Sequence, residues 1–123
     1  MTRPRDPNWM ALAGRAVEAT WAELPPAIHE VAVEIPVLLF EKLPQRFLDE
    51  GLEPDTLGLF EGGDLGQEDH PGQARIFLFL ENLVDFVDGD ESRFLEEVRV
   101  TLLHELGHLL GLDEDALLNR GLD

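Results

Sequence analysis

Residues 104–114 of the chain are His-Glu-Leu-Gly-His-Leu-Leu-Gly-Leu-Asp-Glu. On an α-helix, residues i and i+4 share one face, about 5–6 Å apart at Cβ, so His104 and His108 can direct both imidazoles at one metal ion. A catalytic zinc ion held by two imidazoles needs at least one more protein ligand and an open position for water. Glu105 follows the first histidine, where its carboxylate can reach that water without binding the metal. This is the geometry that a general base needs.

The end of this helix suggests the third ligand. Gly111 can take the left-handed conformation that ends a helix without Cβ strain. The chain can then turn back, and Glu114, or Asp113 beside it, is the nearest candidate ligand. Shuffled chains of this composition contain the His-Glu-x-x-His-x-x-Gly pattern in about 0.1–0.2% of cases. The alternative, a buried amphipathic helix with two solvated histidines, is therefore the weaker interpretation, and the pattern predicts a zinc site.

Length and composition predict one folded domain over residues 1–123. A chain of 123 residues is enough for one core and too short for two, and 44% hydrophobic residues favour folding over disorder. The chain has no cysteine, which excludes disulfides and a thiolate zinc site. No apolar run is long enough to span a bilayer, and the first residues lack the core of a secretory signal. We therefore expect a soluble cytoplasmic protein that does not bind membranes.

The charge restricts the class of partner. Nine basic residues against 26 acidic ones give a net charge of −17. Proteins that bind nucleic acids neutralise phosphates with clustered Lys and Arg, so the sequence argues against a nucleic-acid partner. A strongly negative field favours cationic or neutral peptides over acidic ones. A peptide or protein is therefore the expected substrate or partner.

Two helices and a strand are predicted before residue 42. Asp6-Pro7 has the form of a helix start, with an acidic N-cap and proline at the first helical position, and apolar residues follow at helical spacing as far as Leu24. Residues 26–34 are ambiguous between strand and helix, but proline in the first turn favours a short helix. Residues 36–41 predict a buried strand that starts at a proline.

The middle of the chain predicts two further strands. Residues 43–56 carry turn signals and predict a loop with one helical turn. Residues 57–63 suggest a short strand that ends at a glycine turn. Residues 75–80, apolar and aromatic, form the most strand-like run in the chain. Residues 85–90 predict a connector with acidic N-cap candidates.

A long helix is predicted over residues 92–110. Thr101, His104, Glu105 and His108 share a face that is free to line a cleft. Gly107 costs about 1 kcal/mol in a helix relative to Ala, which predicts that a neighbouring backbone approaches closely there. The expected core stripe of this helix consists of Leu95, Val98, Leu102, Leu106 and Leu109.

Together these segments resemble a small bacterial family of minimal zincins, described as zinc metallopeptidases of unknown substrate. His104-Glu105-x-x-His108-x-x-Gly111 carries the resemblance, and weaker support comes from Glu23-Leu24-Pro25 and residues 35–41, 57–62 and 75–76. The predicted fold is α+β, a minimal zincin-like domain. A short mixed sheet of three or four strands would pack against the N-terminal helix and the C-terminal metal helix.

The resemblance also bears on the site. The family is similar to metzincins in its compact site, and its third-ligand position, usually Asp, is Glu114 here. Metzincins have a methionine turn beneath the metal, whereas the methionines of this chain are Met1 and Met10. Zincin peptidases often stabilise the oxyanion with Tyr or His. Because the chain has no tyrosine, His70 and Arg75 are the candidates for that role.

The expected function is that of a zinc-dependent metallopeptidase, with Zn²⁺ held by His104, His108 and Glu114 and with Glu105 as general base. The strand at residues 75–80 would offer an edge to which an extended peptide adds. One alternative is a zincin-fold module that binds a partner protein through an incomplete site without catalysis. A weaker one is a metal-dependent endoribonuclease. Residues 108–114 also resemble part of the three-histidine motif of bacterial ribosomal-RNA-maturation endoribonucleases, but Glu105 and the acidic charge argue against RNA.

Overall fold

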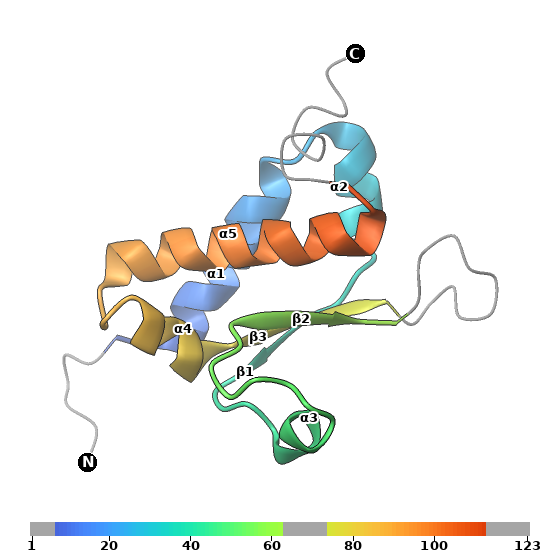
Figure 1. Ribbon diagram of the computed structural model, residues 1–123. Helices are drawn as coiled ribbons and strands as arrows, with labels where there is room; N and C mark the ends of the chain where they lie inside the picture. The colour runs from blue at the N-terminus through green and yellow to red at the C-terminus, as the bar shows by residue number, and fades with distance from the viewer. Residues whose placement is uncertain (1–6, 63–73, 113–123) are drawn as a thin grey trace.

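A computed structural model describes residues 7–62 and 74–112. These residues form an α+β fold, as predicted, in which a three-stranded mixed sheet packs against the N-terminal helix and the C-terminal helix (Figure 1). No helix within the described ranges is long and apolar enough to cross a membrane. The elements in chain order are α1 (Trp9–Ala22), α2 (Pro26–Ala32), β1 (Val37–Phe40), α3 (Gln45–Asp49), β2 (Gly58–Glu61), β3 (Arg75–Phe79), α4 (Leu80–Phe86) and α5 (Glu91–Leu110).

β3 is the central strand of the sheet. The strand order is β1-β3-β2, with β1 parallel and β2 antiparallel to β3. The prediction that residues 75–80 supply a free edge is therefore wrong, because both sides of this strand are already paired. Its continuous apolar run reflects burial on both faces, since every residue from Ile76 to Phe79 is buried. Among the described strands, the edges belong to β1 and β2.

β1 is an edge strand that is only partly buried, in contrast to the buried strand predicted for residues 36–41. Leu38 is 39% exposed, and the other three residues of β1 are half-buried. A short apolar run indicates a strand but does not distinguish a central strand from an edge strand.

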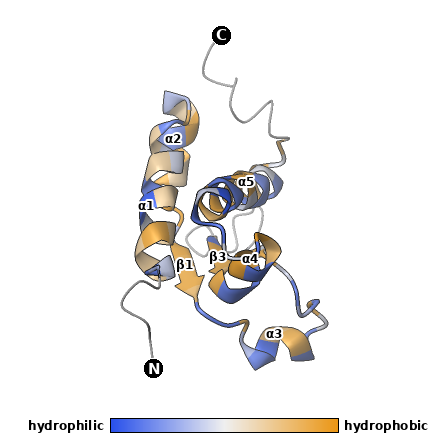
Figure 2. Cartoon of the chain, turned by 90° about the vertical axis from the view of Figure 1, so that its left-hand side faces the viewer, coloured by the Kyte–Doolittle hydropathy of each residue, from blue (hydrophilic) through white to orange (hydrophobic). Residues whose placement is uncertain are grey.

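The sheet lies between two unequal layers. α1 and α5 cover one face, where Ile76 and Leu78 of β3 enter the main core. α3 covers the other face, where Phe47 meets the rings of Phe77 and Phe79 edge-on, with centroids 5.2 and 5.8 Å apart. Figure 2 shows this arrangement, with the apolar β1 and β3 beneath α1 and α5, and α3 on the far side.

Local capping explains where α1 begins. The Oδ1 of Asn8 accepts a hydrogen bond from the Ala11 N–H at 3.1 Å, so Asn8 is the N-cap. The predicted start at Asp6-Pro7 is therefore wrong, because Pro7 precedes the cap; Asp6 lies outside the described residues. The short helix favoured for residues 26–34 is confirmed as α2, with Pro26 in its first turn.

The predicted connector at residues 85–90 is partly helical. α4 follows β3 directly, its N-cap Phe79 makes no side-chain capping bond, and the helix ends at Phe86. A helix that starts without a capping side chain leaves no start signal in the sequence. The acidic N-cap expected in this segment is confirmed at Asp90, whose Oδ1 accepts the Arg93 N–H at 2.9 Å and starts α5.

The buried stripe of α5 differs from the predicted one at its N-terminal end. Leu95, expected in the core, is 37% exposed, whereas Phe94 is fully buried. Phe94 packs edge-on against Trp9 of α1, with ring centroids 4.7 Å apart. The position of α1 therefore shifts the buried face by one residue, an effect of tertiary packing that the spacing of Leu95 does not reveal.

α5 and β2 approach each other closely at Gly58. A Cβ placed on Gly58 would lie 2.7 Å from Cγ2 of Thr101 and 3.2 Å from the Phe77 carbonyl oxygen, which is inside normal contact distance. Thr101, predicted to face a cleft, is instead only 7% exposed. Glycine at position 58 therefore allows α5 to lie directly against the edge strand β2.

Gly58→Ala should lower the free energy of unfolding by about 1–3 kcal/mol, because the new methyl group overlaps Thr101. Urea denaturation measures this loss. In the Thr101→Ser background the same substitution should cost clearly less, since serine lacks the Cγ2 atom. An equal loss in both backgrounds would place the cause in β2 itself rather than in the helix contact.

Candidate metal centre

The two motif histidines lie together on α5, on a face that borders β2. Both side chains are exposed, and their ring centroids are 4.2 Å apart with an angle of 57° between the planes. His108 lies in the last turn of α5, where the negative end of the helix dipole favours a cation. Two exposed imidazoles at this separation fit a shared metal ion, and imidazole is a preferred ligand of zinc.

Glu105 lies beside the histidines but is less exposed than they are. Burial raises the pKa of the Glu105 carboxyl above its usual value, and the nearby His104 and His108 offset part of that rise. A carboxylate whose pKa is shifted toward neutral pH is better suited to accept and return a proton than one at its ordinary value. Glu105 therefore has the electrostatic setting of a general base.

A glycine-dependent turn ends α5 after the histidines. Gly111 has φ of +71°, Leu112 donates its N–H to the Gly107 carbonyl at 2.8 Å, and Gly111 donates its N–H to the His108 carbonyl at 3.3 Å. This pair of bonds is a Schellman motif. The predicted helix end at Gly111 is thereby confirmed. The predicted third ligand, Glu114, and its alternative, Asp113, lie outside the described residues.

The predicted backbone approach at Gly107 is confirmed. A Cβ on Gly107 would lie 2.5 Å from the carbonyl oxygen of Leu112, so the Schellman turn folds back over this position. The turn therefore needs glycine twice, at Gly111 for the positive φ and at Gly107 for space.

The edge of β2 runs beside the histidines. Phe60 meets His108 edge-on, with ring centroids 6.2 Å apart. Phe79 donates its N–H to the Leu57 carbonyl at 3.0 Å, and hydrogen bonding alternates along an antiparallel strand. Leu59 and Glu61 therefore bond to β3, whereas the backbone N–H and C=O groups of Gly58 and Phe60 point away from β3, to an edge that no other described strand pairs with.

The two oxyanion candidates do not join the histidines in the described structure. Arg75 lies on the α3 face of the sheet, where its Nε and Nη2 donate to Oε1 of Glu61 at 3.1 and 2.9 Å. The predicted role for Arg75 is therefore wrong. His70 lies outside the described residues. Within residues 7–62 and 74–112, no group of three or more metal-ligating side chains comes together, so the described part of the centre consists of His104 and His108.

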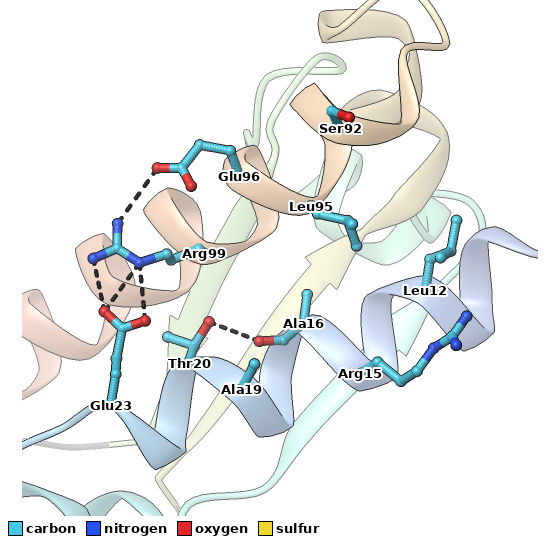
Figure 3. Close-up of a pocket in the computed structure, with 10 residues that line it drawn as sticks. All are labelled: Leu12, Arg15, Ala16, Ala19, Thr20, Glu23, Ser92, Leu95, Glu96 and Arg99. Atoms are coloured by element: carbon cyan, nitrogen blue, oxygen red, sulfur yellow. Dashed lines mark hydrogen bonds and ion pairs between the residues drawn. The ribbon is translucent and has the colours of Figure 1, made fainter.

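A separate pocket of about 500 Å³ lies between α1 and α5 (Figure 3). Arg99 closes one end through charged hydrogen bonds to Glu23, the shortest of which is 2.7 Å, and a contact with Glu96 at 3.4 Å. Neither histidine nor Glu105 lines this pocket, so it is not the predicted cleft. Its lining residues are Leu12, Arg15, Ala16, Ala19, Thr20, Glu23, Ser92, Leu95, Glu96 and Arg99.

The family model of the zincin-like metallopeptidases matches residues 26–122 of the chain. The chain belongs to this family. No curated protein sequence matches the chain significantly. The resemblance inferred from the His-Glu-x-x-His pattern is thereby confirmed. A zincin-like metallopeptidase holds a metal ion, typically zinc, which agrees with the paired imidazoles of α5.

The match to the zincin-like metallopeptidases begins at the first residue of α2 and so leaves out α1. In the fold, however, α1 packs along α5, with Trp9 against Phe94 and Glu23 against Arg99. The matched part of this chain thus shares its core with a helix that lies outside the match.

Gly107→Ala should destabilise the protein although alanine is the better helix former. The methyl group would meet the Leu112 carbonyl, and we expect a loss of about 1–3 kcal/mol in the free energy of unfolding, measured by urea denaturation. Gly14→Ala in α1 is the matched control, because a Cβ there meets nothing within 4 Å. That control should gain about 0.5–1 kcal/mol. A gain at both positions would contradict the close approach at Gly107.

Proposed function

We propose that this protein is a zinc-dependent metallopeptidase that cleaves peptide bonds, with His104 and His108 as metal ligands and Glu105 as general base. The observation that carries the proposal is the arrangement of α5. It presents two imidazoles with centroids 4.2 Å apart next to a half-buried carboxylate of raised pKa. Membership of the zincin-like metallopeptidase family supports the same chemistry.

Each of these residues has a distinct task. His104 and His108 hold the metal through one ring nitrogen each, and we assign the third ligand to Glu114. When bound, zinc supplies a Lewis acid that polarises the substrate carbonyl and lowers the pKa of water. The carboxylate of Glu105 accepts the proton of the attacking water and then transfers it to the nitrogen of the leaving amine.

The edge of β2 is the proposed docking line for the peptide. An extended chain could add to the backbone groups of Gly58 and Phe60, which point to the open edge. Because Phe60 lies against His108, a peptide bound there would place a carbonyl beside the histidines. This assignment replaces the edge predicted at residues 75–80. The net charge of −17 supports a peptide or protein substrate over a nucleic acid.

Metal analysis of the purified protein and its variants tests the proposal. Zinc should bind stoichiometrically, and His104→Ala, His108→Ala and Glu114→Ala should each weaken zinc binding by at least tenfold, since each removes one ligand. Glu105→Gln should keep the zinc and lose more than about 99% of peptidase turnover, because only the general base is removed.

His29→Asn is the matched histidine control. Nδ1 of His29 lies 2.9 Å from the carbonyl oxygen of Trp21, and we assign this histidine no role at the metal, so its replacement should leave zinc affinity unchanged. Peptidase activity that persists in Glu105→Gln would refute the base assignment. Stoichiometric zinc with no turnover on any peptide would favour the non-catalytic binding module instead.

A further inference from the structure

A polar stripe continues along α5 beyond the motif. Glu97 and Thr101 occupy the same face as His104 and His108, because they recur at intervals of three and four residues. Thr101 is the point at which this face touches β2, through the contact with Gly58. Glu97 therefore lies one helical turn before that contact, on the side of α5 that carries the histidines.

The Glu97 side chain lies beside Thr101. The Oγ1 of Thr101 donates a hydrogen bond to Oε2 of Glu97 at 3.4 Å, and Thr101 is itself fixed by its packing against β2. The segment that precedes β2 is hydrogen-bonded to α4, because Nδ2 of Asn82 donates to the Pro54 and Thr56 carbonyls at 2.9 and 2.8 Å. Because Thr101 contacts both the Glu97 carboxylate and Gly58, the first residue of β2, Glu97 lies near the start of that strand.

Glu97 differs from several nearby carboxylates in its partners. Glu23 and Glu96 face Arg99, and Glu61 faces Arg46 and Arg75. Within the described part of the chain, the carboxylate of Glu97 has a hydroxyl partner and no ion pair with a cation. A half-buried carboxylate without a countercharge favours a cation that comes from outside the protein.

We propose that Glu97 selects substrates with a lysine or arginine about three residues from the cleaved bond. This inference rests on the proposed peptidase function and on docking along β2. Glu97 precedes His104 by seven residues, which is about 10 Å along a helix axis. An extended peptide covers that distance in about three residues. A peptide paired with the edge of β2 would therefore carry a side chain past Glu97 while its carbonyl lies at the metal.

Cleavage of a peptide mixture tests the preference. The probe is an equimolar library of short peptides with acetylated and amidated ends, so that only side chains carry charge, and mass spectrometry locates each cut. The zinc-loaded protein should enrich Lys and Arg at one position by about fivefold, the value expected of a partly exposed ion pair. Glu97→Gln should abolish that enrichment.

Glu18→Gln is the control for the overall charge. Glu18 is an exposed residue of α1 outside the site, so this variant removes one negative charge without touching the polar stripe. It should retain the positional enrichment, which would separate a local contact from the long-range field of an acidic protein. Enrichment that survives in Glu97→Gln, or its absence in a protein that does cleave, would overturn the inference while leaving the peptidase function intact.

A binding experiment separates this inference from the proposed function. Immobilised, zinc-loaded Glu105→Gln protein should retain the Lys- and Arg-containing members of the same library, and the Glu105→Gln/Glu97→Gln double variant should retain about fivefold less. If the native protein cleaves nothing but this difference is seen, Glu97 recognises cationic peptides and the peptidase function fails. If neither cleavage nor the difference is seen, both proposals are refuted.

Discussion

The close contact between Gly58 and Thr101 sets the separation of α5 from the sheet, and the arrangement of the candidate site depends on it. A residue larger than glycine at position 58 would displace α5 from the edge of β2. The distance from His108 to Phe60 would then change, and with it the alignment that the proposed function requires between a peptide on β2 and the histidines. The contact between the Thr101 methyl group and the Gly58 backbone thus also positions Phe60 and His108, which lie several residues away.

The two sides of α5 differ in how far their side chains are buried. Its inner side places Phe94, Val98, Leu102 and Leu106 in the core, where they fix the helix by apolar burial. On its exposed side, His104 and His108 are accessible to solvent, whereas Glu105 is half-buried. The same helix therefore anchors the fold and also places side chains in two different environments, because the imidazoles of His104 and His108 are more exposed to water than the Glu105 carboxyl. Under the proposed function, the exposed imidazoles would bind the metal and the half-buried carboxyl would transfer the proton.

Sequence reasoning succeeded where a residue pattern has a single structural meaning. The spacing of His104 and His108 predicts a shared helix face, and Gly111 predicts the left-handed helix end, because few other arrangements satisfy those patterns. The position of β3 in the sheet was predicted wrongly, since an apolar run carries no information about strand order. The spacing of Leu95 predicts a core residue, but Leu95 is exposed, because α1, far away in the sequence, determines which side of α5 is covered. The start of α4 lacks a capping side chain, so the sequence holds no signal for the beginning of this helix. The position of the Arg75 side chain depends on its cross-strand partner Glu61, which local sequence does not reveal.

The packing of α1 on α5 has a consequence for biosynthesis. Glu23 and Arg99, which join the two helices, are 76 residues apart in the chain. On the ribosome, α1 emerges long before the helix that covers its apolar stripe, and contacts of such long sequence separation form slowly. The nascent chain therefore exposes Trp9 and its neighbours until α5 has been translated, which makes the growing chain a target for chaperones. The two histidines belong to the last of the described helices, so the proposed metal site would form only after most of the described core has been translated.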